Sequence, residues 1–255
     1  MKIQGIFSVV MAVRNGGATL TRALDSLMSQ TCGDWECLIQ DGMSDDNTEE
    51  LLAARQDKRL KVAREADSGV YDAWNKALGR LSPESCWVMF LGADDALADP
   101  YVLARASHEL VRLPEDVMFA QAGLNVGRDG KKRECISRSR AEVFQRLVWG
   151  MPLLTPAVFF RTSLFRQANF DSTYRIAGDF AFVAERLAPA NFAVLPFVAS
   201  YMELGGLSSS LRTRSLLQAE RRRVLAECVL PRAAEIVQAC IETLDETADP
   251  MASVR

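Results

Sequence analysis

Four apolar runs of strand length alternate with helix-like segments in the first half of the chain. The runs lie at 6–13, 35–40, 60–63 and 85–91. After the first run, apolar residues recur at helical spacing from Leu20 to Met28. Such alternation is typical of a mainly parallel sheet whose strands are joined by right-handed helical crossovers. The pattern therefore predicts an α/β fold, a Rossmann-like sheet flanked by helices.

The second half of the chain is less regular. Strand-like segments lie at 117–124 and 157–161, and a helix is expected from about Asp179. The basic segment 127–140 is predicted to be a hairpin or a mobile loop. We therefore expect this half to add irregular structure to the sheet rather than to repeat the alternation.

No internal repeat or linker-like segment divides the chain. We predict one domain over residues 1–210, made of a half at about 1–100 and a less regular half at about 101–210. A helical extension is expected over 211–255, and Pro231 is expected to kink or break it.

Composition and charge exclude several classes of protein. The net charge of −3 argues against general nucleic-acid binding, which usually needs a basic domain. The chain has one histidine, His108, so neither a structural zinc site nor Ser/His or Cys/His chemistry is expected. Six cysteines without a CxxC pair are interpreted as reduced, packed thiols. With neither a signal peptide nor a membrane-length apolar stretch visible, we expect a cytoplasmic protein.

Polar clusters follow three of the predicted strands. "RNGG" follows the first run, "DGMSDD" the second and "GADD" the fourth. Ligands of such sheets bind at the carboxyl ends of the strands, so we expect the three loops to converge on one crevice. Asp94 and Asp95 either start a turn or share a cation, because adjacent ionised carboxylates repel one another. A hard divalent cation such as Mg²⁺ or Mn²⁺ would suit them.

The order of these segments resembles family 2 glycosyltransferases, the inverting group with the GT-A fold. The resemblance covers about residues 6–210 and is closest to a bacterial polysaccharide-synthesis branch of the colanic-acid type. It rests on Ser26, Gln30 and Thr31 and on the segments "DGMSDDNT", "READSGVYDAWNKAL", "FLGADD", "YRIAGDFAFVAERL" and "ELGGLSS". Any one motif is weakly specific, whereas five in this order at plausible spacing are much more so.

The resemblance implies a nucleotide site. Its residues would be Val13, Arg14, Asn15, Asp41, Asp67, Gly69, Asp72, Asn75, Lys76 and Asp94. Asp41 is expected to bind the nucleobase, although the same position suits an aspartate that caps a turn. Asp46 is assigned to the local turn and the helix start. Trp74 is expected to pack in the core because of its helical register.

The resemblance also implies a metal pair and a general base. Asp95 would bind Mg²⁺ or Mn²⁺, and Asp94 would lie near the ribose or the metal. Gly92 stands where the family often has Asn or Asp. Asp179 is the expected base, with a pKa raised by a partly apolar wall, although an ordinary helix N-cap would also suit it. Asp171 is the second candidate.

Gly205, Gly206, Arg212 and Arg214 are expected on the acceptor or diphosphate side. Thr155 and Pro156 stand where this branch usually has a His-Gln pair. The implied partners are a nucleotide-sugar donor, UDP-sugar favoured with GDP and dTDP open, and a saccharide or lipid-linked saccharide acceptor. The basic C-terminal helix suggests peripheral contact with the inner face of a membrane.

Two other readings remain at this point. A sugar nucleotidyltransferase shares an α/β nucleotide domain, but "RNGGATLTR" is a poor phosphate loop. The second alternative is a non-catalytic relative that only binds a nucleotide sugar. The combination of Asp41, Asp94, Asp95 and Asp179 favours an inverting, metal-dependent glycosyltransferase, in bacterial cell-surface polysaccharide or glycolipid synthesis.

Overall fold

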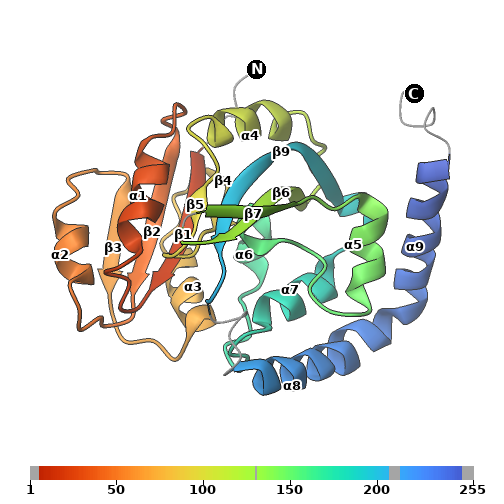
Figure 1. Ribbon diagram of the computed structural model, residues 1–255. Helices are drawn as coiled ribbons and strands as arrows, with labels where there is room; N and C mark the ends of the chain where they lie inside the picture. Colours follow the sequence, from red (N-terminus) through yellow and green to blue (C-terminus); the bar gives the residue numbers. More distant parts are fainter. Residues whose placement is uncertain (1–5, 130, 207–212, 249–255) are drawn as a thin grey trace.

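A single mixed sheet organises the computed structural model, which describes residues 6–129, 131–206 and 213–248 (Figure 1). Its nine strands in this part of the chain run in the order β3-β2-β1-β4-β8-β6-β9-β5, with β7 paired to β6. The strands are β1 (Ile6–Val13), β2 (Trp35–Asp41), β3 (Leu60–Arg64), β4 (Ser85–Phe90), β5 (Ala96–Leu97), β6 (Phe119–Arg128), β7 (Lys131–Ile136), β8 (Val158–Arg161) and β9 (Phe192–Glu203).

The first four long strands form the parallel half of the sheet. β1 lies between β2 and β4, and β3 forms the edge beyond β2. In this register Val13 lies beside Asp41, and Asp41 beside Arg64, so the strand ends coincide. β8 then runs antiparallel to β4, while β6 and β9 pair in parallel. The predicted α/β fold with its mainly parallel sheet is confirmed.

Helices cover both faces of the sheet. One face carries α1 (Leu20–Met28), α2 (Thr48–Ala53) and α4 (Val102–Leu110). The other carries α3 (Val70–Leu78), α5 (Arg140–Leu147), α6 (Ser163–Gln167), α7 (Gly178–Arg186), α8 (Arg214–Val224) and α9 (Ala233–Ala248). Short 3-10 turns, η1 (Thr155–Ala157) and η2 (Pro189–Asn191), precede β8 and β9. In Figure 1, α8 and α9 follow the edge of the molecule away from α2.

Alternation along the central strands divides the core into two layers. In β1, Val9 and Met11 pack with α1, whereas Val10 packs with α3, because successive side chains point to opposite faces. The second layer holds an aromatic cluster in which Trp74 lies 4.4 Å from Phe90 between ring centroids. The prediction that Trp74 packs in the core is confirmed.

The structure also tests the expectations for the basic segment, for Pro231 and for the cysteines. The basic segment forms the β6–β7 hairpin, and Pro231 lies in a 3-10 turn (Leu230–Arg232) that, with a π turn (Leu225–Val229), separates α8 from α9. The described cysteines are free thiols, as expected, but Cys135 on β7 is exposed rather than packed because the hairpin stands clear of the core. None of the described helices has the length and apolarity to cross a membrane.

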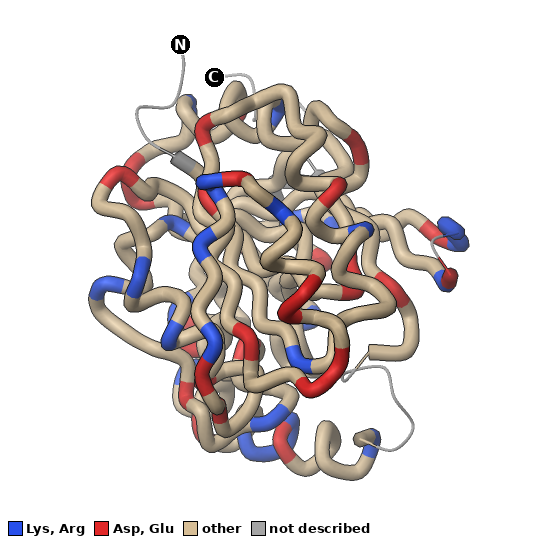
Figure 2. Tube along the Cα trace, turned by 90° about the vertical axis from the view of Figure 1, so that its left-hand side faces the viewer, with Lys and Arg blue, Asp and Glu red and all other residues tan. Residues whose placement is uncertain are grey.

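Charges of both signs are interspersed along the chain trace, in keeping with the small net charge (Figure 2).

The buried carboxylate of Glu220 holds the turn that precedes α7. The Glu220 carboxylate of α8 accepts hydrogen bonds from the backbone N–H groups of Arg175, Ile176 and Ala177, at 2.7, 2.9 and 2.9 Å. Glu220 is 8% exposed, so these bonds are shielded from water. The turn that leads into α7 is therefore fixed by a residue of the C-terminal extension.

We predict that Glu220→Ala lowers the free energy of unfolding by about 3 kcal/mol, because three backbone donors lose a charged acceptor. Urea denaturation measures the change. The matched control, Glu242→Ala on the exposed side of α9, should change stability by less than about 0.5 kcal/mol. Equal effects of the two substitutions would contradict this account of the turn.

Candidate active site

The loops after β1 and β2 are joined to each other. The Asn15 backbone N–H donates to Ser44 Oγ at 2.8 Å, and the Asp45 N–H donates to Asn15 Oδ1 at 3.0 Å. Asn15 takes a left-handed conformation with φ 57°, which asparagine tolerates better than most residues. Val13 is buried, and its carbonyl accepts the Gly42 N–H at 2.9 Å. Two of the three predicted polar loops, those after β1 and β2, are thus hydrogen-bonded to each other, and Arg14 in the first of them is exposed.

Asp41 is the last residue of β2, next to these two loops, and is 1% exposed. One carboxylate oxygen accepts the Ser44 N–H at 3.0 Å, and the other accepts Arg64 Nε at 3.2 Å. The carboxylate therefore shapes the loop, and its nucleobase contact stays a prediction. Asp46 accepts the Thr48 N–H at 3.0 Å at the start of α2, in the turn role assigned to it.

The loop before α3 lies against the β2 loop. A Cβ on Gly42 would lie 2.3 Å from Asp67 Oδ2, so only glycine leaves room for that carboxylate. Asp67 Oδ1 accepts the Gly69 N–H at 3.0 Å, and Gly69 has φ +140°, which suits glycine. The Ser68 N–H donates to Asp72 Oδ2 at 2.8 Å. The segment from Asp67 to Gly69 therefore packs against the loop after β2, in the region where we expected the nucleotide.

Two predicted nucleotide ligands already have protein partners. Asn75 donates to the Phe170 carbonyl at 2.8 Å and accepts its N–H at 2.9 Å, which joins α3 to the segment before α7. Lys76 pairs with Glu65 at 2.9 Å and with Asp72 at 3.5 Å. Their nucleotide contacts therefore stay predictions.

Asp94 and Asp95 turn their carboxylates toward Gly92 in the loop after β4. A Cβ there would lie 2.7 Å from Asp94 Oδ1 and 2.8 Å from Asp95 Oδ2. Glycine at this position therefore makes room for the two carboxylates. Asp95 is 5% exposed and accepts the Glu203 N–H at 2.9 Å. Burial, and secondarily the charge of Asp94, raises the pKa of Asp95 to about 7.

This pair fits a hard divalent cation that takes most of its ligands from elsewhere. No group of three or more His, Cys, Asp or Glu side chains suited to a metal occurs among the described residues. Mg²⁺ and Mn²⁺ need only one or two protein carboxylates when substrate phosphates complete the shell. A cation would also relieve the repulsion that raises the pKa of Asp95.

Arg22 of α1 holds the acidic loop in place. Its guanidinium donates to the Asp94 carbonyl, pairs with Glu203 at 2.8 Å and lies 5.3 Å from the centre of the Tyr201 ring. Gly206 lies on the other side, where a Cβ would be 3.2 Å from Asp94 Oδ2. The β4 loop, α1 and the end of β9 therefore meet at the aspartate pair.

Asp179 lies in the first turn of α7 and is partly exposed. Thr155 Oγ1 donates to Asp179 Oδ2 at 2.8 Å, and Tyr71 Oη lies 3.1 Å from Asp179 Oδ1. Burial raises the pKa of Asp179, and the hydrogen bond from Thr155 opposes that rise. The N-cap position belongs to Ala177, so the alternative interpretation of Asp179 as a helix cap is wrong.

Tyr71 has one proton for two acceptors. Its hydroxyl donates to the Ile176 carbonyl at 2.6 Å, a shorter contact than the one with Asp179. Burial, and secondarily the charge of Asp179, raises the pKa of Tyr71, so it stays protonated. Tyr71 is thus the weaker donor to Asp179 Oδ1, which also accepts the Phe180 N–H at 2.8 Å.

Further contacts connect the start of α7 to the strand-end loops. Arg175 donates to the Ser68 carbonyl and lies beside Gly69, and Gly178 packs against the Tyr71 ring. On the other side, Ser200 Oγ donates to the Pro156 carbonyl, and Ser200 of β9 pairs with Leu97 of β5, two residues after Asp95. These contacts bring α7, the α3 loop and the β4 loop toward one region of the molecule.

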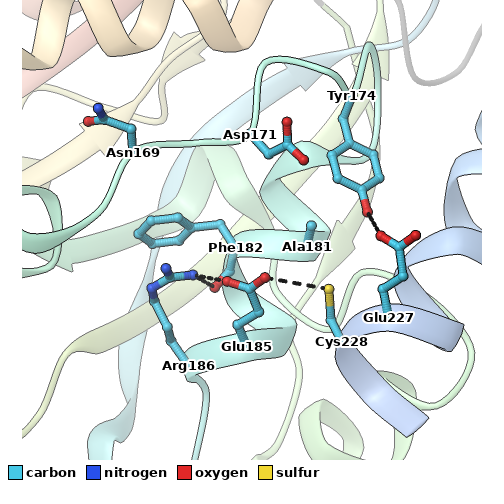
Figure 3. A pocket seen from close by; sticks show the side chains of 9 residues that line it. All are labelled: Asn169, Asp171, Tyr174, Ala181, Phe182, Glu185, Arg186, Glu227 and Cys228. Atoms are coloured by element: carbon cyan, nitrogen blue, oxygen red, sulfur yellow. Dashed lines mark hydrogen bonds and ion pairs between the residues drawn. The ribbon is translucent and has the colours of Figure 1, made fainter. Parts of the chain in front are cut away.

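Asp171, the second candidate base, faces a different cavity. This cavity has a volume of about 120 Å³ and lies between α7, the π turn after α8 and the segment before α7 (Figure 3). Its lining residues are Asn169, Asp171, Tyr174, Ala181, Phe182, Glu185, Arg186, Glu227 and Cys228. Asp171 pairs with Arg223 at 3.4 Å, and Glu185 pairs with Arg186 at 2.6 Å. Ion pairs therefore occupy this cavity, and the choice of Asp179 over Asp171 as the base stays a prediction.

The remaining predicted residues lie at the edge of this region. Gly205 has φ +123° and belongs to the turn after β9, next to Gly206. Arg214 is the first residue of α8 and is exposed, so its diphosphate contact stays a prediction. Arg212 lies outside the described residues.

Sequence reasoning missed four residues that build this site. Tyr71, Arg22 and Glu220 are not among the residues that the sequence analysis assigns to the site, and Thr155 enters it only as a replacement for a histidine. None carries a local signal, because each acts on a residue at least 24 positions away. Their side-chain partners could be found only from the tertiary fold.

The mixed sheet, with its parallel first half and acidic strand-end loops, is that of the GT-A glycosyltransferase fold, as the solved structures of two such enzymes show. Staphylococcus aureus TarS 1–349 in complex with UDP-GlcNAc has this fold, with a TM-score of 0.68 at 19% identity over 90% of this chain and 73% of that one. Mannosyltransferase PcManGT of Pyrobaculum calidifontis, in complex with GDP-Man and Mn²⁺, gives 0.65 at 17% identity over 98% and 78%.

The chain belongs to glycosyl transferase family 2, whose sequence profile matches residues 8–171. A PGL/p-HBAD biosynthesis glycosyltransferase of Mycobacterium bovis is 31% identical over 84% of this chain and 83% of its own length. The Escherichia coli UDP-Glc:alpha-D-GlcNAc-diphosphoundecaprenol beta-1,3-glucosyltransferase WfgD is 32% identical over 35% of each chain. The protein is therefore a glycosyltransferase.

Because Thr155 donates to the ionised carboxylate, we predict that Thr155→Val raises the pKa of Asp179 further. A base must be deprotonated to act, so the acid limb of the kcat/KM profile should move to higher pH. Activity should fall most below neutral pH and recover as pH rises. Thr155→Ser keeps the hydroxyl and should keep the wild-type limb. A limb that Thr155→Val leaves in place would contradict the role of this hydrogen bond.

Proposed function

We propose that the protein is an inverting, metal-dependent glycosyltransferase that moves a sugar from a nucleoside-diphosphate donor to a hydroxyl acceptor. The observation that carries the proposal is the state of Asp179. It is a partly exposed carboxylate with a raised pKa, hydrogen-bonded by Thr155 and adjacent to elements that meet the Asp94–Asp95 loop. Such a group can accept a proton at neutral pH.

The transfer follows from this arrangement as one displacement. Asp179 takes the proton of the acceptor hydroxyl while the oxygen attacks the anomeric carbon. The bond from that carbon to the donor phosphate breaks, and the nucleoside diphosphate leaves with the electron pair. Attack opposite the leaving group inverts the configuration at the carbon. Thr155 orients the base and stabilises its charged form before the proton moves.

Asp95, with Asp94 beside it, would hold Mg²⁺ or Mn²⁺. A bound divalent ion supplies positive charge that offsets the charge developing on the departing diphosphate. Arg22 fixes the main chain of Asp94, and the Glu203 N–H fixes Asp95, so both carboxylates are positioned by contacts outside their own loop. This preorganisation avoids moving charged groups when the donor binds.

A UDP-sugar is the favoured donor, with GDP- and dTDP-sugars as alternatives. TarS is described in complex with UDP-GlcNAc and WfgD as using UDP-Glc, whereas PcManGT was solved with GDP-Man. We propose a saccharide or lipid-linked saccharide acceptor in bacterial cell-surface glycan or glycolipid synthesis. Work on such an acceptor would place the protein in the cytoplasm, peripherally at the inner face of the membrane. Family membership favours this function over a nucleotidyltransferase.

Asp179→Asn should lower kcat by about 10²- to 10⁴-fold, because the amide cannot take the proton. Binding of UDP with Mn²⁺, measured by isothermal titration calorimetry, should change less than about twofold. Asp171→Asn is the matched control and should keep turnover, since Asp171 pairs with Arg223 at the separate cavity. Full turnover by Asp179→Asn would show that another group is the base and would leave the non-catalytic alternative open.

Asp95→Ala should raise the Kd of the nucleotide in the presence of Mn²⁺ at least tenfold, because the metal loses its main carboxylate. A thermal-shift screen of UDP, GDP and dTDP, with Mn²⁺ and with EDTA, identifies the nucleotide and tests the metal dependence together. Asp116→Ala, an exposed aspartate before β6, is the control. Stabilisation by a nucleotide that survives both EDTA and Asp95→Ala would refute the metal assignment.

A further inference from the structure

We propose that an exposed patch at the ends of α5 and α8 docks this protein on the surface of an anionic lipid bilayer. The patch, which we call the Trp149 patch, consists of Arg146, Val148, Trp149 and Arg221. The proposal rests on the proposed function, because a lipid-linked acceptor would have to be met at a membrane.

Trp149 is the most exposed large apolar side chain of the described residues. It is 79% exposed, whereas Trp35 and Trp87 are 3% and 2% exposed in the core. Val148 beside it is 41% exposed. An indole ring exposed to water lacks the free energy that burial of its apolar surface would provide. Tryptophan prefers the interface between water and lipid, where the ring is partly buried.

The cations of the patch outnumber the acidic groups beside them. Glu142, one turn before Arg146 on α5, is an exposed carboxylate whose pKa is lowered by hydrogen bonds from Ser139 and, more weakly, by the charge of Arg146. Arg146 and Arg221 are exposed, and neither forms an ion pair with any of the described residues. They come together because the Arg221 guanidinium lies close to Gly150, with its Nε 3.5 Å from where a Cβ would be. Arg222, the next residue of α8, is also exposed. The local charge is therefore positive on a chain whose net charge is −3.

The patch is held in place by the main chain around it. The Trp149 and Gly150 N–H groups donate to the Arg146 carbonyl at 2.8 and 3.0 Å, which continues the last turn of α5. Arg138 donates to the Pro152 carbonyl at 2.6 Å. The pKa of Arg138 is lowered to about 10, mainly by burial and secondarily by the charge of Arg146, so the two cations lie close together. Trp149 is thus presented on a fixed turn.

The same turn leads directly to the proposed base. Thr155, whose hydroxyl donates to Asp179, lies six positions after Trp149 in the chain. A segment of that length spans at most about 20 Å. An acceptor sugar attached to a lipid in the bilayer could therefore reach the base while the Trp149 patch rests on the headgroups.

Anionic lipid is the partner that these residues fit. Each arginine near a bilayer containing anionic lipid contributes about 1 kcal/mol of binding, and tryptophan adds insertion at the headgroup level. Guanidinium groups bind phosphate oxygens in a bidentate geometry, which matches phospholipid headgroups. A protein partner, including a second copy of the chain, is the alternative that the experiment must separate.

The experiment is co-sedimentation of the full chain with vesicles of phosphatidylglycerol and phosphatidylcholine at low ionic strength. The wild type should bind them, bind pure phosphatidylcholine weakly, and dissociate as salt rises. Arg146→Gln with Arg221→Gln should lower the partition coefficient about thirty-fold, the equivalent of about 1 kcal/mol per arginine. Trp149→Ala should lower it about tenfold.

Matched controls are available on the opposite side of the molecule. Lys58→Gln removes an exposed charge in the segment between α2 and β3, and Tyr101→Ala removes a 59% exposed aromatic side chain just before α4. α2 and α4 cover the face of the sheet opposite to α5 and α8. Both should bind vesicles like the wild type. Tryptophan emission should shift to shorter wavelength on vesicles, and Trp149→Phe should abolish this shift. Trp35 and Trp87 are buried, and the half-buried Trp74 is packed in the aromatic cluster of the core, so none of the three should contact lipid.

Three results would overturn the proposal. They are no binding of the wild type to anionic vesicles, equal losses in the Lys58→Gln control, and concentration-dependent self-association without lipid that the arginine substitutions abolish. Transfer to a soluble acceptor should be unchanged in all patch variants. Vesicle binding in a protein without transferase activity would reject the proposed function alone, whereas transfer without vesicle binding would reject only the Trp149 patch.

Discussion

The hydrogen-bonded environment of Asp179 is the constraint on which the site depends. The carboxylate comes from α7, the Thr155 hydroxyl from the turn before β8, and the Tyr71 hydroxyl from α3. These elements belong to both halves of the chain, so Asp179 has these partners only when the halves have packed together. Asn75, which bonds the Phe170 backbone, and Arg175, which bonds Ser68, reinforce the same junction.

Ionisation of Asp179 and Asp95 lowers the free energy of unfolding of the protein. Burial raises the pKa of Asp179 above its ordinary value, so the folded protein favours the protonated form more than the unfolded chain does. The stabilisation from that protonated form is complete below the unfolded pKa and is lost as pH rises through the folded pKa. Asp95 has the same sign, with a folded pKa of about 7. Ionising either carboxylate as pH rises through its folded pKa therefore lowers the stability of the folded protein.

Much of the fold could be predicted from the sequence, because strand and helix periods are local properties. The strand-end positions of Asp41 and Asp95 followed from the same pattern. The partners of the site residues could not be predicted. Arg22 reaches Asp94 across 72 positions and Tyr71 reaches Asp179 across 108, and each lies on a helix face that gives no sign of its target. Asn75 and Lys76 have protein partners that only the packing of α3 reveals.

Glu220 changes how the end of the chain should be regarded. Sequence alone divides a catalytic region up to residue 210 from a helical extension, yet this one carboxylate gathers three amide groups immediately before α7. A protein that stopped before α8 would retain Asp41, Asp94, Asp95 and Asp179 and would lose the acceptor of these three N–H groups. The C-terminal helices therefore pack as part of the same folded unit as α7.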